Sequence, residues 1–158
     1  MKKSFLITTL VAAGLFLGRA PLASAQAMPV ATCTISTTAT ISFGAYSVFN
    51  PSPNDSNGTL TFVCTGVAGP VTISLMGIQP DGSRALKNGG DMLSYHVFSD
   101  AARSQVWGDG TFGSAPVTFA KPVDGAVNTA VMFGRIFPRQ DVTFGPYSDS
   151  FVAVVNFQ

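Results

Sequence analysis

The sequence is short of the side chains from which many functional sites are built. Its 158 residues include no glutamate, one histidine, one tryptophan and two cysteines, and charged residues make up only 11%. So few basic residues form no patch that could hold nucleic acid or an anionic membrane. A metal site needs more cysteine or histidine ligands than are present. The composition therefore argues against both classes of protein.

Catalytic arrangements are equally hard to assemble. His96 falls on the polar face of a candidate strand, and no serine sits in a nucleophile turn. The aspartates lie in turns, with Asp149 as the exception, which disfavours a glycosidase pair. Asp109 stands between two glycines, where it is typical of a hairpin turn, because calcium needs about six to eight oxygen ligands. We predict that the protein is not an enzyme and requires no cofactor or metal.

The first 25 residues predict a secretory signal peptide. Lys2 and Lys3 precede an uncharged apolar run over residues 5–18, and Ala23-Ser-Ala25 offers a small-residue cleavage site. The alternative is a retained membrane anchor, for which the run is short. Cleavage after Ala25 leaves one domain, residues 26–158, with six basic side chains against eight aspartates, a net charge of about −2. We therefore expect an exported protein.

Both cysteines, Cys33 and Cys64, belong to the exported part. Because an exported chain meets an oxidising environment, they predict one disulfide. A metal ligand or a catalytic thiol is the alternative, but either would need partner residues that the sequence does not supply. Closing a loop of this length stabilises a fold by about 3–4 kcal/mol in the chain-entropy model.

The remaining composition predicts an all-β domain. Glycine, threonine, serine, valine and phenylalanine are abundant, and strong helix formers are scarce. Short strands separated by turn residues favour a sandwich or barrel. We expect a loop over residues 50–58 and an irregular stretch over 84–91. The expected strands are 33–43, 59–65, 71–75, 92–99, 116–121, 127–137, 142–144 and 151–157.

Alternation predicts which side chains of these strands face the core. In the strand over 71–75 the inward residues are Val71, Ile73 and Leu75. In the strand over 92–99 they are Leu93, Tyr95 and Val97, which leaves His96 exposed. In the strand over 127–137 we expect Val127, Val131 and Phe133 to face inward.

Trp107 has two interpretations. A lone tryptophan before a glycine-rich turn is usually a core or rim residue, but it can also be a platform on which a sugar stacks. Trp107 is therefore the candidate surface-binding residue, and a secreted adhesive or glycan-binding module is the alternative function.

The final stretch, residues 147–158, has an apolar side chain at every second residue from Phe151 onward. Phe151, Ala153, Val155 and Phe157 share one face, which is typical of a half-buried strand. The sequence ends on this strand without a segment to cover its edge, and an uncovered apolar edge invites pairing with another chain. We predict that a strand from outside completes this edge.

Several short motifs, in a fixed order across the exported part, carry a family resemblance. They include Phe43-Gly-Ala-Tyr46, Ser99-Asp-Ala-Ala-Arg103, Trp107-Gly-Asp-Gly-Thr111, Phe133-Gly-Arg-Ile136 and Gly145-Pro-Tyr-Ser-Asp149. Together they resemble the spore coat protein U domain family, which includes the subunits of archaic chaperone–usher pili.

The resemblance implies an incomplete immunoglobulin-like β-sandwich that lacks its final strand and is completed by a donor strand. It implies a periplasmic chaperone, an outer-membrane usher and neighbouring pilus subunits as partners, and a path through the periplasm to the cell surface. The family disulfide corresponds to Cys33 and Cys64. The groove-lining strand corresponds to Phe151, Ala153, Val155 and Phe157.

The segment before the first cysteine departs from the family. Shaft subunits carry a donor segment of alternating apolar residues there, whereas this sequence has residues 26–32, which include Pro29. Proline removes a ladder donor, and Met28 and Val30 fill two pockets at most. We expect a subunit that accepts a strand but donates poorly, and hence a position at the tip of the fibre.

Overall fold

Nine β-strands and no helix form the part of the chain that a computed structural model describes, residues 30–36 and 40–158. The predicted signal peptide and its cleavage site lie outside these residues. Among the described residues there is accordingly no helix suited to crossing a membrane. The all-β prediction is confirmed. The strands are β1 (Thr32–Ile35), β2 (Thr40–Ile41), β3 (Asn54–Thr65), β4 (Val71–Leu75), β5 (Arg84–Asn88), β6 (Asp91–Phe98), β7 (Val117–Phe119), β8 (Val127–Ile136) and β9 (Ala153–Phe157).

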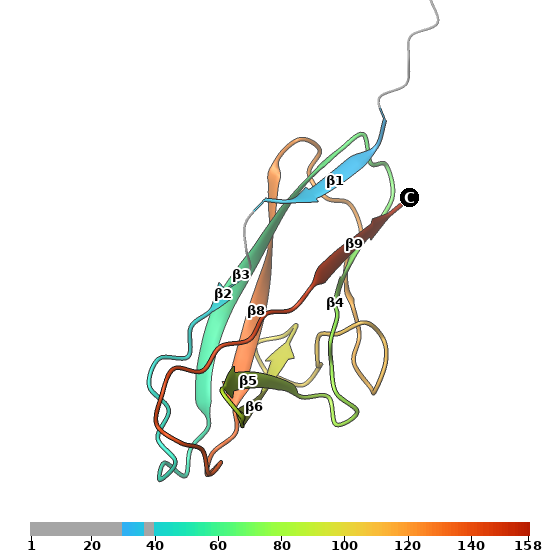
Figure 1. Cartoon of the computed structure of the whole chain (residues 1–158). Helices are drawn as coiled ribbons and strands as arrows, with labels where there is room; N and C mark the ends of the chain where they lie inside the picture. Colours follow the sequence, from blue (N-terminus) through green and yellow to red (C-terminus); the bar gives the residue numbers. More distant parts are fainter. Residues whose placement is uncertain (1–29, 37–39) are drawn as a thin grey trace, which may run out of the picture.

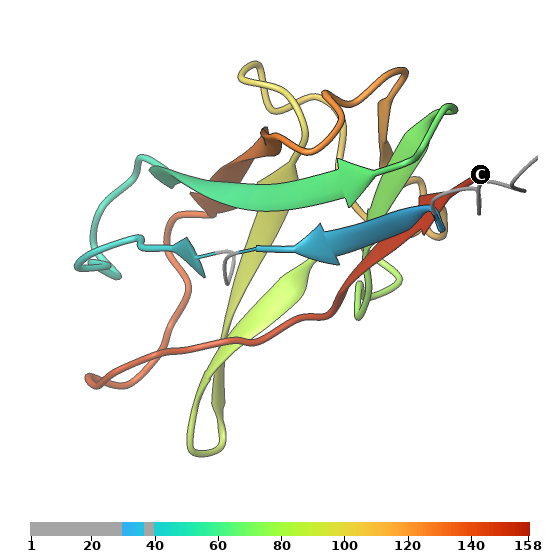
Figure 2. The same cartoon turned by 90° about the horizontal axis from the view of Figure 1, so that it is seen from above.

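The strands form two antiparallel sheets that pack face to face (Figures 1 and 2). The larger sheet has six strands in the order β1-β3-β8-β6-β5, with β2 also paired to β3. The smaller sheet has three strands in the order β7-β4-β9. The ladder between β3 and β8 is the longest and runs from Asn54 opposite Ile136 to Val63 opposite Val127. It forms the centre of the larger sheet.

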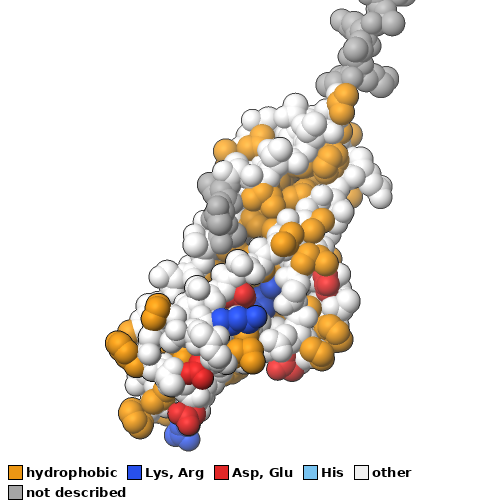
Figure 3. Space-filling model, viewed as in Figure 1, with side chains coloured by type: hydrophobic (Ala, Val, Ile, Leu, Met, Phe, Trp, Pro, Cys, Tyr) orange, Lys and Arg blue, Asp and Glu red, His pale blue; other side chains and the backbone are white. Residues whose placement is uncertain are grey.

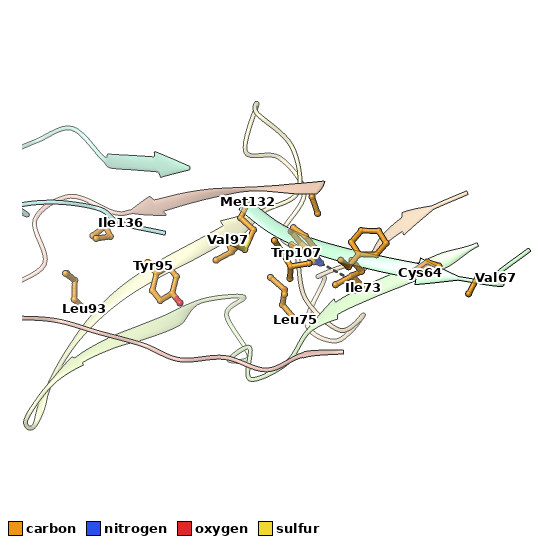
Figure 4. Close-up of a cluster of buried hydrophobic side chains, with 14 residues drawn as sticks. Cys64, Val67, Ile73, Leu75, Leu93, Tyr95, Val97, Trp107, Met132 and Ile136 are labelled. Carbon is orange, nitrogen blue, oxygen red and sulfur yellow. Dashed lines mark hydrogen bonds between the residues drawn. The ribbon is translucent and has the colours of Figure 1, made fainter. Parts of the chain in front are cut away.

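The core lies between the sheets and is centred on Trp107 (Figure 4). The indole is 0% exposed, and its Nε1–H donates a hydrogen bond of 2.9 Å to the carbonyl oxygen of Ile73. Fully burying a large apolar side chain contributes about 1.5–3 kcal/mol. The fully buried apolar set draws on both sheets and includes Leu60, Phe62, Val71, Ile73, Leu75, Val97, Met132 and Ile136.

Three predictions about strand positions were wrong: residues 142–144 do not form a strand, and two segments that were expected to be irregular are strands. Residues 54–58 belong to β3 rather than to a loop, and residues 84–88 form β5 rather than an irregular stretch. Both segments are polar, so their alternation is weak. They are strands because the whole length of β8 is available to pair with β3, and because Gly89 and Gly90 turn β5 back onto β6. Tertiary pairing overrides local propensity here.

The inward face of β8 was also predicted wrongly. Val127 is 65% exposed and Val131 42% exposed, whereas Ala130, Met132 and Ile136 are buried. The inward set is the less obvious one because it includes Gly134, where an added Cβ would lie 2.6 Å from the Phe43 ring. Because the Phe43 ring fills the space beside Gly134, the sequence shows a glycine at a position where an inward apolar residue would be expected.

Candidate functional site

The last strand, β9, is an edge strand. It pairs antiparallel with β4, from Val71 opposite Phe157 to Leu75 opposite Ala153, and with no other strand of the described chain. On the larger sheet, the edge that lies nearest is formed by β1 and β2, and β1 contacts β9 (Figures 1 and 2). Two sheet edges therefore flank one side of the core, and no strand of the described residues lies between them.

We define the groove as the space between these edges and their extensions. Its first wall consists of β1, β2 and residues 42–49, and its second wall consists of residues 142–152 and β9. Half-buried apolar side chains from both walls, including Cys33 and Phe43 on one side and Phe151 and Val155 on the other, pack against the core. Hydrophobic side chains gather in the hollow between β1 and β9 in Figure 3. The groove is apolar where the sandwich is open.

The predicted groove residues lie on the second wall. Phe151, Ala153 and Val155 are half-buried and contact the core. Phe157, at the end of β9, remains 36% exposed, and its packing into a filled groove stays a prediction. Val154 points to the opposite face of the strand and is also 36% exposed.

The groove deepens at the end farther from β1. A cavity of about 790 Å³ opens there between residues 40–49 and residues 142–147. Leu86, Leu93 and Ile136 of the larger sheet contribute to its lining, and aromatic side chains of both walls surround it. The volume of this cavity lies within the range of pockets that bind small molecules or large side chains, about 300–1,000 Å³.

Hydrogen bonds from side chains fix the second wall to the larger sheet. The Asp91 carboxylate accepts hydrogen bonds from the backbone N–H and the hydroxyl of Thr143, and these bonds lower the pKa of Asp91. Gln140 pairs with the backbone of Ser94 in both directions, at 2.7 and 2.8 Å. Such bonds let residues 140–147 follow the edge without forming a regular strand.

The first wall is fixed by close packing and by hydrogen bonds of several side chains, among them Tyr46 and Asn54. The Tyr46 hydroxyl donates to the carbonyl of Phe137 and accepts from the backbone N–H of Gln140, at 3.2 and 2.8 Å. The Asn54 amide donates to the carbonyls of Phe43 and Ala45. The wall lies close to the sheet because Gly58 and Gly134 have no side chain: a Cβ at Gly58 would lie 2.2 Å from the carbonyl oxygen of Thr40.

The disulfide prediction is confirmed in the structure. Cys33 and Cys64 are bonded at 2.01 Å and occupy opposite positions in the β1–β3 ladder. The bond therefore fastens the outermost strand of the first wall to the centre of the larger sheet.

The structure contradicts the surface role of Trp107. Its ring is fully buried and its only polar group is bonded to Ile73, so no face remains for a ligand. His96 is half-buried rather than exposed, because its ring packs edge-on against Phe98 and Phe137, and burial lowers its pKa. No group of residues suited to a metal ion occurs within the described ranges.

Sequence reasoning placed Phe151, Ala153 and Val155 on the core-facing side of the last strand, as the structure does, but it did not find the contacts that shape the walls. Tyr46 and Gln140 are 94 positions apart, and Asp91 and Thr143 are 52 positions apart. No local pattern links such residues, and each reads as an ordinary turn or edge residue on its own.

Comparisons with known proteins agree with this geometry. A family model described as the Spore Coat Protein U domain matches residues 20–154. No curated protein matches the chain.

Solved structures that share the fold include three from pilus assemblies. One is a chain of the CsuC–CsuE chaperone–tip adhesion subunit pre-assembly complex from archaic chaperone–usher Csu pili of Acinetobacter baumannii, with 22% identity and a TM-score of 0.56. That match covers 81% of this chain and 40% of the other, so this chain spans less than half of that protein. The P pilus rod subunit PapA is 22% identical with a TM-score of 0.51, covering 80% and 99%. A chaperone–usher pilus structure that concerns rod uncoiling is 19% identical with a TM-score of 0.52, covering 93% and 100%.

Proposed function

Because the chain belongs to the Spore Coat Protein U domain family, we propose that it is a structural subunit of a chaperone–usher surface pilus and that it accepts a donor β-strand in the groove. It has no enzymatic role. The observation that carries the proposal is the free edge of β9 beside an apolar hollow, opposite the edge of β1 and β2.

A strand laid in the groove would meet two kinds of interaction. The free edge of β9 offers backbone groups for a new ladder, and the half-buried side chains Phe151, Ala153 and Val155 offer contacts for every second residue of the incoming strand. Each aliphatic side chain that becomes buried contributes about 1.5–3 kcal/mol. The sandwich gains its missing strand and the hollow is filled.

The partners follow from this chemistry. A periplasmic chaperone would supply the strand first, and a neighbouring pilus subunit would replace it at an outer-membrane usher. The protein would be exported to the periplasm and end on the cell surface. A position at the tip remains a prediction, because most of the segment on which it rests, residues 26–29, lies outside the described residues. The alternative of a glycan-binding module loses its candidate residue, since Trp107 is buried.

The test compares the two faces of β9. Val155→Asp places a charge on the face that contacts the core, and Val154→Asp places the same charge on the opposite face. Since burying an unpaired charge is strongly unfavourable, Val155→Asp and Phe157→Asp should abolish co-purification of a one-to-one complex with the co-expressed chaperone. Val154→Asp should retain it.

Melting temperatures of the variants serve as the folding control. Equal chaperone recovery with Val154→Asp and Val155→Asp would contradict the proposal, as would a wild-type domain that is monomeric and highly stable without any added strand.

A further inference from the structure

Arg84 is the one charged side chain that is buried among the described residues, with 2% exposure. It begins β5, in the larger sheet, and reaches across to the smaller one. Its guanidinium donates hydrogen bonds to the carbonyl of Met76 at 2.7 Å and to that of Leu75 at 2.9 Å, where β4 ends. The side chain thus joins the two sheets beside the groove.

The same guanidinium lies against the second wall. Its central carbon is 4.9 Å from the centre of the Phe151 ring, the first of the groove residues. Near Phe151 the backbone hydrogen bonds of the second wall change from β5 to the residue that follows β4. Ser148 exchanges hydrogen bonds with Lys87 of β5, whereas the carbonyl of Val152 accepts from Met76, next to β4. Arg84 therefore lies where the chain crosses from one sheet to the other.

A buried cation at this place is costly. No carboxylate of the described residues forms an ion pair with Arg84, and burial lowers its pKa. The carboxylates of Asp149 and Asp109 favour the charged form of Arg84 without pairing with it, and the Asp149 carboxylate accepts a hydrogen bond of 2.8 Å from the Tyr95 hydroxyl. Well-packed apolar residues often replace buried charges without loss of stability, so packing alone does not account for an arginine.

We propose that Arg84 is a positioning residue, which holds the crossing at residues 148–152 so that the second wall keeps its shape while the free edge of β9 has no partner. The planar guanidinium suits this task because it binds two carbonyls and stacks on a ring at once, which a lysine ammonium cannot do. The inference rests on the proposed function of the groove.

The test measures strand capture directly. The oxidised chain is refolded with a fluorescent synthetic peptide in which valine and threonine alternate between terminal lysines, and capture is followed by anisotropy. Loss of charge-assisted hydrogen bonds should slow capture by Arg84→Met at least about tenfold. Hydrogen exchange should accelerate in residues 148–157 and remain unchanged in β3 and β8.

Val97→Ala is the matched control, since Val97 is buried in β6, belongs to the core between the two sheets and lies outside the residues that form the two walls. It should weaken the fold as a whole and leave the capture rate within about twofold, because its cavity lies in the common core. If Arg84→Met changes capture and exchange in the same way as Val97→Ala, Arg84 is an ordinary core residue and the inference is wrong.

Two milder variants keep the test decisive if Arg84→Met does not fold. Arg84→Lys retains the charge, and Phe151→Leu retains both hydrogen bonds but removes the ring. Each should slow capture by a smaller factor, and unchanged capture by both overturns the inference. If the wild-type chain captures no peptide, the proposed function fails together with the positioning role.

Discussion

β3 and β9 are both strands of an antiparallel sandwich, but they differ in what covers their edges. β3 is paired on one edge with β1 and β2 and on the other with β8. β9 is paired only with β4 among the strands that the structure describes. The first region is complete within this chain and the second lacks one neighbour. The difference shows that one domain can contain a sheet whose central strands are paired on both edges and a sheet that ends on a free edge.

Hydrogen exchange should reveal this difference most strongly. We expect amides on the free edge of β9 to exchange at least about a thousandfold faster than those between β3 and β8, because the latter open only with global unfolding, at about 5–15 kcal/mol. Mass spectrometry after timed labelling checks the expectation. A bound strand should remove most of the difference, and equal protection of both regions without it would contradict the comparison.

Trp107→Ala should have the next largest effect, because it breaks the contact between the two sheets. Removing a buried aromatic ring costs about 3–5 kcal/mol. Denaturant unfolding of the strand-complemented domain measures the loss. Phe112→Ala, which removes an exposed aromatic ring, should change stability by less than about 0.5 kcal/mol and serves as the control. A loss below 1 kcal/mol for Trp107→Ala would be inconsistent with its central place in the core.

The double variant Cys33→Ser, Cys64→Ser tests how firmly the first wall is tied to the complete sheet. We expect a loss of about 3–4 kcal/mol from the entropy of the opened loop. Exchange in β1 should also accelerate more than exchange in β8. Mass spectrometry of unreduced wild-type protein provides the reference, and detection of two alkylated thiols there would remove the basis of this prediction.

The smallest effect concerns the outer face of the complete sheet. Asp55 of β3 pairs with Arg135 of β8 at 2.7 Å, and this bond, with Arg103 nearby, lowers the pKa of Asp55. Its contribution is therefore present above the unfolded pKa of about 3.9 and is lost as the pH falls through the lower folded value.

Because the pair is partly exposed, Asp55→Asn should cost only about 0.2–1 kcal/mol at neutral pH. The cost should vanish in acid. Unfolding curves at several pH values measure the loss of stability in Asp55→Asn, and Asp141→Asn, at an exposed aspartate, is the control. A cost that does not change with pH would show that the charge is not responsible.

The sequence predicted those strands in which apolar and polar residues alternate cleanly. β4 and β6 have the expected inward faces, with Val71, Ile73 and Leu75 in one and Leu93, Tyr95 and Val97 in the other. It did not predict the first half of β3, because that segment is polar and becomes a strand only when β8 lies beside it.

The candidate site likewise has one part that the sequence predicts and another part that it does not. The groove face of β9 could be predicted because Phe151, Ala153 and Val155 obey the two-residue period. The walls could not be predicted. Arg84 reads as an ordinary surface residue in sequence, and only the fold brings it to the carbonyls of β4 and the ring of Phe151.

The two glycines beneath the first wall have a consequence for mutations at these positions. Any side chain at Gly58 would meet the backbone of Thr40, and any side chain at Gly134 would meet the ring of Phe43. A mutation that adds a side chain at either position should therefore displace a segment of the chain that is remote in sequence. The position of the wall therefore depends on two bare points of the sheet as well as on the hydrogen bonds of Tyr46 and Asn54 and on the disulfide.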